Sequence, residues 1–466
     1  MRKRIPTVWT AVFVSTLSVG CVTPSQTQVE AGVDRATAEA LPPVSEAWRA
    51  ASREGAVQVG WIAAFDDPVL SSLVAEAQAN NLNLAAAAAG VAQAQALARQ
   101  AGASLTPDLG LNLGGTRSGL LEGDGPGTGS TLTAGLQVGW EADVWGRIRS
   151  GTAQAAASAQ AAEADYVFAQ YSVAANTAIA YFTAIEANLQ TQIAKDSFEV
   201  LDRTRQIVEA QYNEGMASAQ DLALSKSDLA SARDQVAELE GISRDALRAL
   251  ELLLGRYPGA DLAVRNALPA VPSAPPTGVP SELLERRPDL IAAEREVAAA
   301  FNAVNQAKAA RLPTVSLTGT IGGTSNALSS LLDPANVAWS AGTSLLAPIF
   351  DGGRLRENVT IANAQQEAAL ANYADAALRA FSDVESALDQ GEVLTDRDDA
   401  LQEAADQAAE AYRVAELRYK EGETSLIDLL TIQQRVIGTR SSLSSVQRLL
   451  LLQRVNLNLA LGGSWE

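Results

Sequence analysis

The residues that decide the fold are DGGRLRENVTIANAQQ (351–366) and the segment that continues them, in which no proline occurs as far as residue 421. Good helix formers dominate this segment, chiefly Ala, Gln, Glu, Leu and Arg. The sequence YKEGETS (419–425) interrupts it, and a second helical segment then continues to residue 461. At 1.5 Å per residue, the first segment would form a helix roughly 100 Å long. A helix of that length must lie against similar helices, so we predict a helical hairpin over residues 353–462.

The same hairpin pattern occurs earlier in the chain. GRIR (146–149) corresponds to GRLR (353–356), and the offset is 353 − 146 = 207 residues. Further pairs share this offset: Tyr212 and Tyr419, Gly215 and Gly422, Asp221 and Asp428, Leu254 and Leu461. A constant offset over so long a segment indicates an internal duplication, which predicts a first hairpin over residues 146–255.

Each repeat contains two segments in which apolar and polar residues alternate with a period of two, and each segment predicts a strand. A helix precedes each pair of strands, at about 69–104 in the first repeat and 287–311 in the second. The predicted strands are at about 108–118, 131–142, 314–322 and 337–349. The predicted organisation is a first repeat (61–257), a linker (258–280) and a second repeat (281–466).

The composition excludes several classes of function. The 466 residues include no His and one Cys, so the usual metal sites and Cys/His catalysis have no ligands. There are 35 basic and 54 acidic residues; without residues 1–20, which hold three basic residues and no acidic ones, the balance is 32 − 54 = −22. That charge argues against nucleic-acid binding. We find no phosphate-binding loop or nucleophile elbow, and expect neither an enzyme nor a cofactor.

The N-terminus has the pattern of a signal peptide over residues 1–20. A basic start (RKR, 2–4) precedes an apolar run that is too short to span a bilayer, and Cys21 follows Gly20. This resembles a bacterial lipobox, except that Ser18 stands where leucine is usual. We expect Cys21 to be lipidated, the alternative being a secreted protein with an incidental cysteine. Residues 21–60 are rich in Thr, Ser, Gln, Ala and Pro, and are predicted to form an extended tether.

Two strands per repeat give four strands per chain, which cannot close a membrane barrel. Strand edges must be paired in lipid, so such a chain needs partners. Three chains would provide twelve strands, enough to enclose a lumen, and twelve long helices that could form a tube. The predicted fold class is an α+β membrane protein, with a duplicated repeat of helix, two strands and long helical hairpin. A solitary coiled coil, as in a trimeric adhesin, is the alternative that the helices alone would allow.

The order of lipobox, WIAAFDDP (61–68), leading helix and twice-used Tyr-x-x-Gly…Asp-Leu turn resembles the TolC-like outer-membrane efflux proteins. The lipoprotein branch that serves pumps of the resistance-nodulation-division type is the most similar. The resemblance implies a homotrimer with a 12-strand β-barrel in the outer membrane, continuous with a 12-helix tunnel in the periplasm. It implies a passive exit duct that works with a periplasmic adaptor and an inner-membrane pump. A type I secretion duct remains an alternative.

The resemblance also assigns roles to the two turns. Adaptor docking is expected at the turns, which contain Gly215, Gly422 and Tyr212; the glycines could equally serve only to end a helix. The periplasmic gate is expected to use a bond between Tyr419 and Asp221 and a ring of Asp428 from three chains. A second bond is absent because Thr424 replaces an arginine, and a second acidic ring is absent at Thr431. Both aspartates could instead simply cap the helices that follow the turns.

Overall fold

The computed structural model describes residues 26–119 and 129–465, with the exception of residues 51, 53, 54, 56 and 58. The chain divides into two compact units. We call them the sheet unit (residues up to 35, 98–155 and 298–366) and the helix unit (36–97, 156–297 and from 367 onward). The predicted signal peptide and Cys21 lie outside the described residues.

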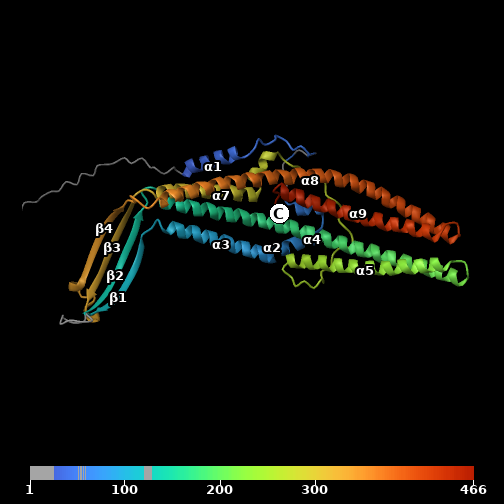
Figure 1. The fold of residues 1–466 in the computed structure, drawn as a ribbon, viewed down its shortest axis with the longest axis horizontal. Helices are drawn as coiled ribbons and strands as arrows, with labels where there is room; N and C mark the ends of the chain where they lie inside the picture. The colour runs from blue at the N-terminus through green and yellow to red at the C-terminus, as the bar shows by residue number, and fades with distance from the viewer. Residues whose placement is uncertain are drawn as a thin grey trace, which may run out of the picture. The chain divides into compact units, whose positions relative to one another are not determined.

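The sheet unit contains one antiparallel sheet in the order β1-β2-β3-β4 (Figure 1). Strand β4 ends three residues before the predicted end at 349, since 349 − 346 = 3. Strand β2 joins the two repeats, because it pairs with β1 of its own repeat and with β3 of the second repeat. The strands are β1 (Asp108–Ser118), β2 (Gly129–Ala142), β3 (Thr314–Ser325) and β4 (Val337–Leu346).

The register places most of the large apolar residues of the four strands on one face of the sheet; Leu346, at the end of β4, lies on the other. Leu111 pairs with Leu136, Leu136 pairs with Ile321, and Ile321 pairs with Trp339. The neighbouring positions on the opposite face are small or polar: Asn112, Gly135, Gly322 and Ala338. Successive side chains of a strand point to opposite faces, so a one-residue slip would exchange the two faces.

Two helical hairpins account for most of the remaining chain (Figure 1). The first consists of α4 (Arg147–Asn213) and α5 (Ala219–Leu253), and the second of α8 (Arg354–Lys420) and α9 (Leu426–Ala460). None of the described helices combines the length and the apolarity needed to cross a membrane. The other helices are α1 (Gln26–Ala40), η1 (Trp61–Phe65), α2 (Pro68–Asn80), α3 (Leu82–Ala103), η2 (Pro280–Glu282), α6 (Leu283–Arg286), α7 (Pro288–Ala309), η3 (Leu328–Ser330) and η4 (Pro334–Asn336).

The predicted extended tether is wrong for residues 26–50. Helix α1 occupies Gln26–Ala40, and it buries Val29, Val33 and Thr37, which are spaced four residues apart on one helix face. Further along, the ring of Trp48 lies 6.5 Å from that of Phe381, and its indole N–H donates to the carbonyl of Gly278 at 3.2 Å. The polar composition concealed this helix, because only a narrow face of it, with two valines and a threonine, is buried.

Buried Asp67 joins three parts of the helix unit. Its carboxylate caps α2 by accepting hydrogen bonds from the backbone N–H groups of Val69 and Leu70 at 2.9 and 3.2 Å. It also accepts the hydroxyl of Tyr181 on α4 at 3.1 Å and the guanidinium of Arg265 in the linker at 3.0 Å. Burial and, to a smaller extent, the negative charge of the Asp67 carboxylate raise the pKa of the Tyr181 hydroxyl well above its usual range. The phenol therefore remains a hydrogen-bond donor to the carboxylate at any physiological pH.

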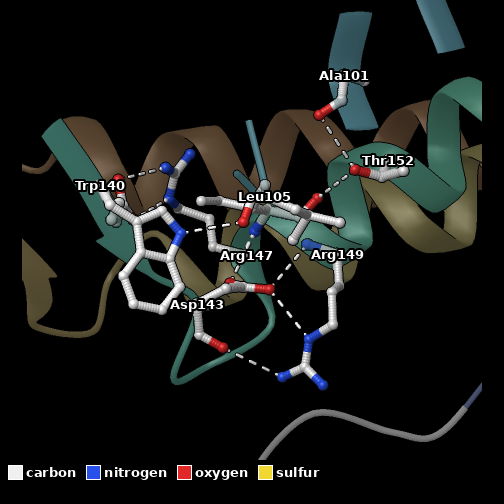
Figure 2. Close-up of polar contacts among 9 residues, drawn as sticks. Ala101, Leu105, Trp140, Asp143, Arg147, Arg149 and Thr152 are labelled. Carbon is white, nitrogen blue, oxygen red and sulfur yellow. Dashed lines mark hydrogen bonds and ion pairs between the residues drawn. The ribbon is translucent and has the colours of Figure 1, made fainter. Parts of the chain in front are cut away.

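Side chains fix the geometry where β2 turns into α4 (Figure 2). The carboxylate of Asp143 accepts the backbone N–H groups of Ile148 and Arg149, each at 2.9 Å, which satisfies free donors in the first turn of α4. The guanidinium of Arg147 donates to Glu141 at 2.8 and 3.1 Å, so the last residues of β2 are tied to the first turn of the helix. The indole of Trp140 donates to the carbonyl of Leu105 at 3.0 Å.

Candidate functional site

The two hairpin turns have the same backbone geometry. Gly215 (φ 77°) and Gly422 (φ 80°) both adopt a left-handed conformation. Each helix ends in the same pair of bonds. In the first turn, the N–H groups of Gly215 and Met216 donate to the carbonyls of Tyr212 and Gln211 at 3.0 and 2.8 Å. In the second, those of Gly422 and Glu423 donate to the carbonyls of Tyr419 and Arg418 at 3.1 and 2.9 Å. A Cβ atom at either glycine would meet nothing within 4 Å, so the backbone angle, and not space, requires glycine there.

A serine and an aspartate begin the helix after each turn. Ser218 caps α5, because its hydroxyl accepts the Asp221 N–H at 3.1 Å while the Asp221 carboxylate accepts the Ser218 N–H at 3.0 Å. Ser425 caps α9, with its hydroxyl accepting the Asp428 N–H at 3.2 Å and donating to the Asp428 carboxylate at 2.7 Å. The serine hydrogen bonds hold the pKa of both aspartates below the usual range. Both carboxylates are therefore charged at neutral pH.

The predicted bond between Tyr419 and Asp221 is not the one that the structure contains. The Tyr419 hydroxyl donates instead to the side-chain oxygen of Gln211 at 3.2 Å. Asp221 is bonded within its own turn by Ser218, whose hydroxyl donates to it at 2.7 Å. Asp221 is still close enough to affect the ionisation of the phenol. Burial and, to a smaller extent, the negative charge of Asp221 raise the pKa of Tyr419. At the turns, the hydrogen bond between the two hairpins therefore runs from the Tyr419 phenol to the Gln211 amide.

The other predicted gate residues have local roles. Thr424 donates to the Asp428 carboxylate at 3.4 Å, which adds a weak bond to the cap of α9. Thr431 donates to the carbonyl of Ile427 in the preceding turn at 2.8 Å and is exposed. Neither threonine bridges the two hairpins through these bonds.

An apolar cluster next to the turns also joins the hairpins. Val208 of α4 packs with Leu426 and Leu430 of α9, and the ring of Tyr419 lies against this cluster. Burial of these apolar side chains stabilises the contact between the two hairpin ends but does not depend on orientation. The Tyr419 hydrogen bond depends on angle, so it fixes how the two ends are oriented. The sequence did not identify Gln211, because spacing along a helix cannot show which side chain of another hairpin it meets.

Apolar side chains are exposed at the turns, where the sequence predicts adaptor docking. Met216 follows the first turn glycine and is 69% exposed, and Ile427, in the first turn of α9, is 53% exposed. Tyr212, the counterpart of Tyr419 in the first repeat, is 42% exposed. These three side chains place exposed apolar surface at both turns.

The comparisons with known proteins agree on one protein family. The chain matches the family described as outer membrane efflux protein over residues 73–256 and 279–463. It is 34% identical to the pyoverdine export outer membrane protein OpmQ of Pseudomonas aeruginosa, over 90% of this chain and 91% of that protein. It is 30% identical to the cation efflux system protein CusC of Escherichia coli, over 87% of this chain and 88% of that protein.

The fold matches a solved structure of the same kind. The Campylobacter jejuni CmeC outer membrane channel superimposes with a TM-score of 0.84 and 26% sequence identity, over 91% of this chain and 94% of that one. The family consists of outer-membrane efflux channels and not of enzymes. Two hairpins, an antiparallel sheet and a match over both repeats establish that this chain belongs to the outer membrane efflux protein family.

Proposed function

We propose that three copies of this chain assemble into one channel, with a twelve-strand barrel continuous with a twelve-helix tunnel. The observation that carries this proposal is the sheet itself. It is open, with β1 and β4 at its edges, and its apolar face is exposed. Leu109, Leu111 and Leu113 on β1 are each about two-thirds exposed, and Trp339 on β4 is 76% exposed.

An open sheet with such a face is unstable in water and in lipid. In water, the apolar face would promote association. In lipid, the unpaired N–H and C=O groups of β1 and β4 would each cost several kcal/mol, on the order of the value for a buried unsatisfied group. Pairing β4 of one chain with β1 of the next satisfies both edges, and three chains with four strands each close the barrel.

The channel is the exit duct of a tripartite efflux pump, with an adaptor that docks at the two turns. Its support is the combination of the family, the left-handed glycines Gly215 and Gly422, and the exposed Met216 and Ile427. The duct itself is passive, and the inner-membrane pump selects the substrate. Pyoverdine and cations are named for the relatives OpmQ and CusC, and a deletion strain tested against both classes would identify the substrate of this chain.

The turns also form the periplasmic gate. Tyr419 and Gln211 hold the second hairpin against the first, and Asp428 of the three chains forms a ring of negative charge at the constriction. Asp221 acts on the gate through its charge beside Tyr419. Thr431 contributes no charge, so a single ring sets the preference for cations. Cys21 adds a lipid anchor to the attachment that the barrel provides.

Cross-linking between engineered cysteines tests the assembly. One cysteine at Asn112 on β1 is combined with a set of single cysteines along β4, and the purified protein in detergent is oxidised. We expect covalent trimers at one register and three chains by mass measurement. The control places cysteines at Gln137 and Thr320, which are paired within one chain and should cross-link without changing the mass. A monomer with full β content, or protein without conductance in planar bilayers, would contradict the proposal.

A further inference from the structure

The two repeats of the chain meet in the sheet where β2 pairs with β3, and we call this contact the internal seam (Figure 1). Its last pair of residues is Ala142 and Val315, and both side chains are half-buried. Just beyond that pair, the indole N–H of Trp145 donates to the carbonyl of Pro313 at 2.6 Å. The internal seam therefore shows how the second strand of one repeat packs against the first strand of the next.

The duplication shows which residues would form the corresponding seam between two copies of the chain. The first strands of the two repeats follow Pro107 and Pro313, which are 313 − 107 = 206 residues apart. The second strands lead into the two hairpins, which are 353 − 146 = 207 residues apart. Applied to the last pair of the internal seam, these offsets give positions 142 + 207 = 349 and 315 − 206 = 109. Repeats of one design make equivalent contacts with their neighbours, so the seam between copies would end on Ile349 of one copy and Leu109 of the next.

The two faces of the sheet provide a separate check on this assignment. In an antiparallel pair the two residue numbers add up to a constant, here 349 + 109 = 458, so Leu345 would lie opposite Leu113 and Leu346 opposite Asn112. Leu113 and Leu345 both belong to the exposed apolar face, and Asn112 and Leu346 both belong to the other face. Residues that lie opposite each other must point to the same face, so a register shifted by one residue is excluded. The register taken from the duplication meets this requirement.

Exposed apolar side chains lie at the end of this seam. Ile349 is 92% exposed and Leu109 is 69% exposed, whereas the corresponding pair of the internal seam is half-buried. Strand β3 begins at Thr314, opposite Leu346, so the residues after Leu346 have no strand beside them in the single chain. Strand β2, in contrast, continues on β3 as far as the position that corresponds to Ile349. The end of β4 therefore lacks the neighbour that β2 has.

The hydrogen bond at the end of the internal seam has no counterpart between copies. The position that corresponds to Trp145 is 145 + 207 = 352, and Gly352 has no side chain that could donate. Pro348, which has no backbone N–H, stands shortly before it, as is common on edge strands. Contact at this end of the seam therefore depends on apolar side chains.

We propose that Ile349 of one copy packs against Leu109 of the next, and that β4 and β1 pair in the register that places Leu346 opposite Asn112. The inference rests on the proposed assembly, to which it adds the register and the apolar contact. The occupant of this surface is a second copy of the chain, because the neighbouring repeat covers the corresponding positions of the internal seam. Burial of two exposed apolar side chains then stabilises the place where β4 leads into α8.

Three double-cysteine variants of the full-length protein in detergent test the register. Each combines Asn112→Cys with Ser344→Cys, Leu346→Cys or Pro348→Cys, and the matching single variants control for the native Cys21. Directly opposite Cβ atoms lie about 4.5–5.5 Å apart and those two positions away about 7–8 Å, so a disulfide forms readily at one register only. We expect the largest yield of covalent trimer with Leu346→Cys. The largest yield at either neighbour overturns the register but leaves the assembly standing, and no cross-link between chains in any variant overturns both.

The apolar contact has a test of its own. Ile349→Cys combined with Leu109→Cys should also give covalent trimers. Ile349→Asn should lower the temperature at which the trimer dissociates in detergent by several degrees. The control is Leu328→Asn in the connection between β3 and β4, where the side chain is 76% exposed, and it should leave that temperature unchanged. If Ile349 faces lipid and not the next copy, neither the cross-link nor the shift will be found, and the proposed contact is wrong even if the trimer forms.

Discussion

The bond from Tyr419 to Gln211 makes the most direct prediction about the gate. Tyr419→Phe removes only the hydroxyl, and the ring keeps its place against Leu426 and Leu430. The matched control is Tyr212→Phe at the corresponding position of the first repeat, where the side chain is exposed. If the phenol bond holds the hairpins together, the first variant opens the channel and the control does not.

The size of the effect follows from the geometry of the bond. It is a neutral hydrogen bond of 3.2 Å between partly buried groups. Such a bond contributes about 0.5–1.5 kcal/mol. Three chains that open together would lose about 1.5–4.5 kcal/mol of closed-state stability, and each 1.4 kcal/mol changes an equilibrium about tenfold. We therefore expect the ratio of open to closed channels to rise by about ten- to a thousandfold.

Single-channel recording in planar bilayers measures this ratio. Tyr419→Phe should lengthen and multiply the open periods, and Gln211→Met, which removes the acceptor, should have the same effect. The double variant should be no more open than either single variant, because both remove one bond. Additive effects would show that the two residues act separately. If both single variants conduct as the unchanged protein does, the bond has no part in the gate.

Three further predictions concern other sites. Asp428→Ala should lower cation selectivity in the same bilayers. Hydrogen bonds from Ser425 hold the pKa of Asp428 below its usual range, and a carboxylate is charged above its pKa. The unchanged protein should therefore keep its selectivity at neutral pH and lose it only as the pH falls through that lowered pKa. Cys21→Ser should abolish labelling by a radioactive fatty acid, and labelling that persists would refute the anchor site. Tyr181→Phe should destabilise the protein by about 1.5–3 kcal/mol in thermal unfolding, because it removes a bond to the buried, charged Asp67; an unchanged melting temperature would contradict that estimate.

The sequence alone determined the elements that depend on local patterns. Long helices follow from helix-forming composition without proline, and the turns follow from Gly215 and Gly422, which both adopt positive φ angles. The alternation in the strands is local too, since neighbouring side chains point to opposite faces of a sheet. The constant offset of 207 residues revealed the duplication, and the family resemblance built on these features is established by the comparisons.

Only the tertiary structure decided which residues meet. It pairs β2 with β3 of the other repeat, packs α1 where a tether was expected, and places the Gln211 side chain against the Tyr419 hydroxyl. The physical reason is the same in each case. Contacts between residues some two hundred positions apart depend on how complete helices and strands pack, and helix periodicity fixes a face of the helix but not the partner of that face.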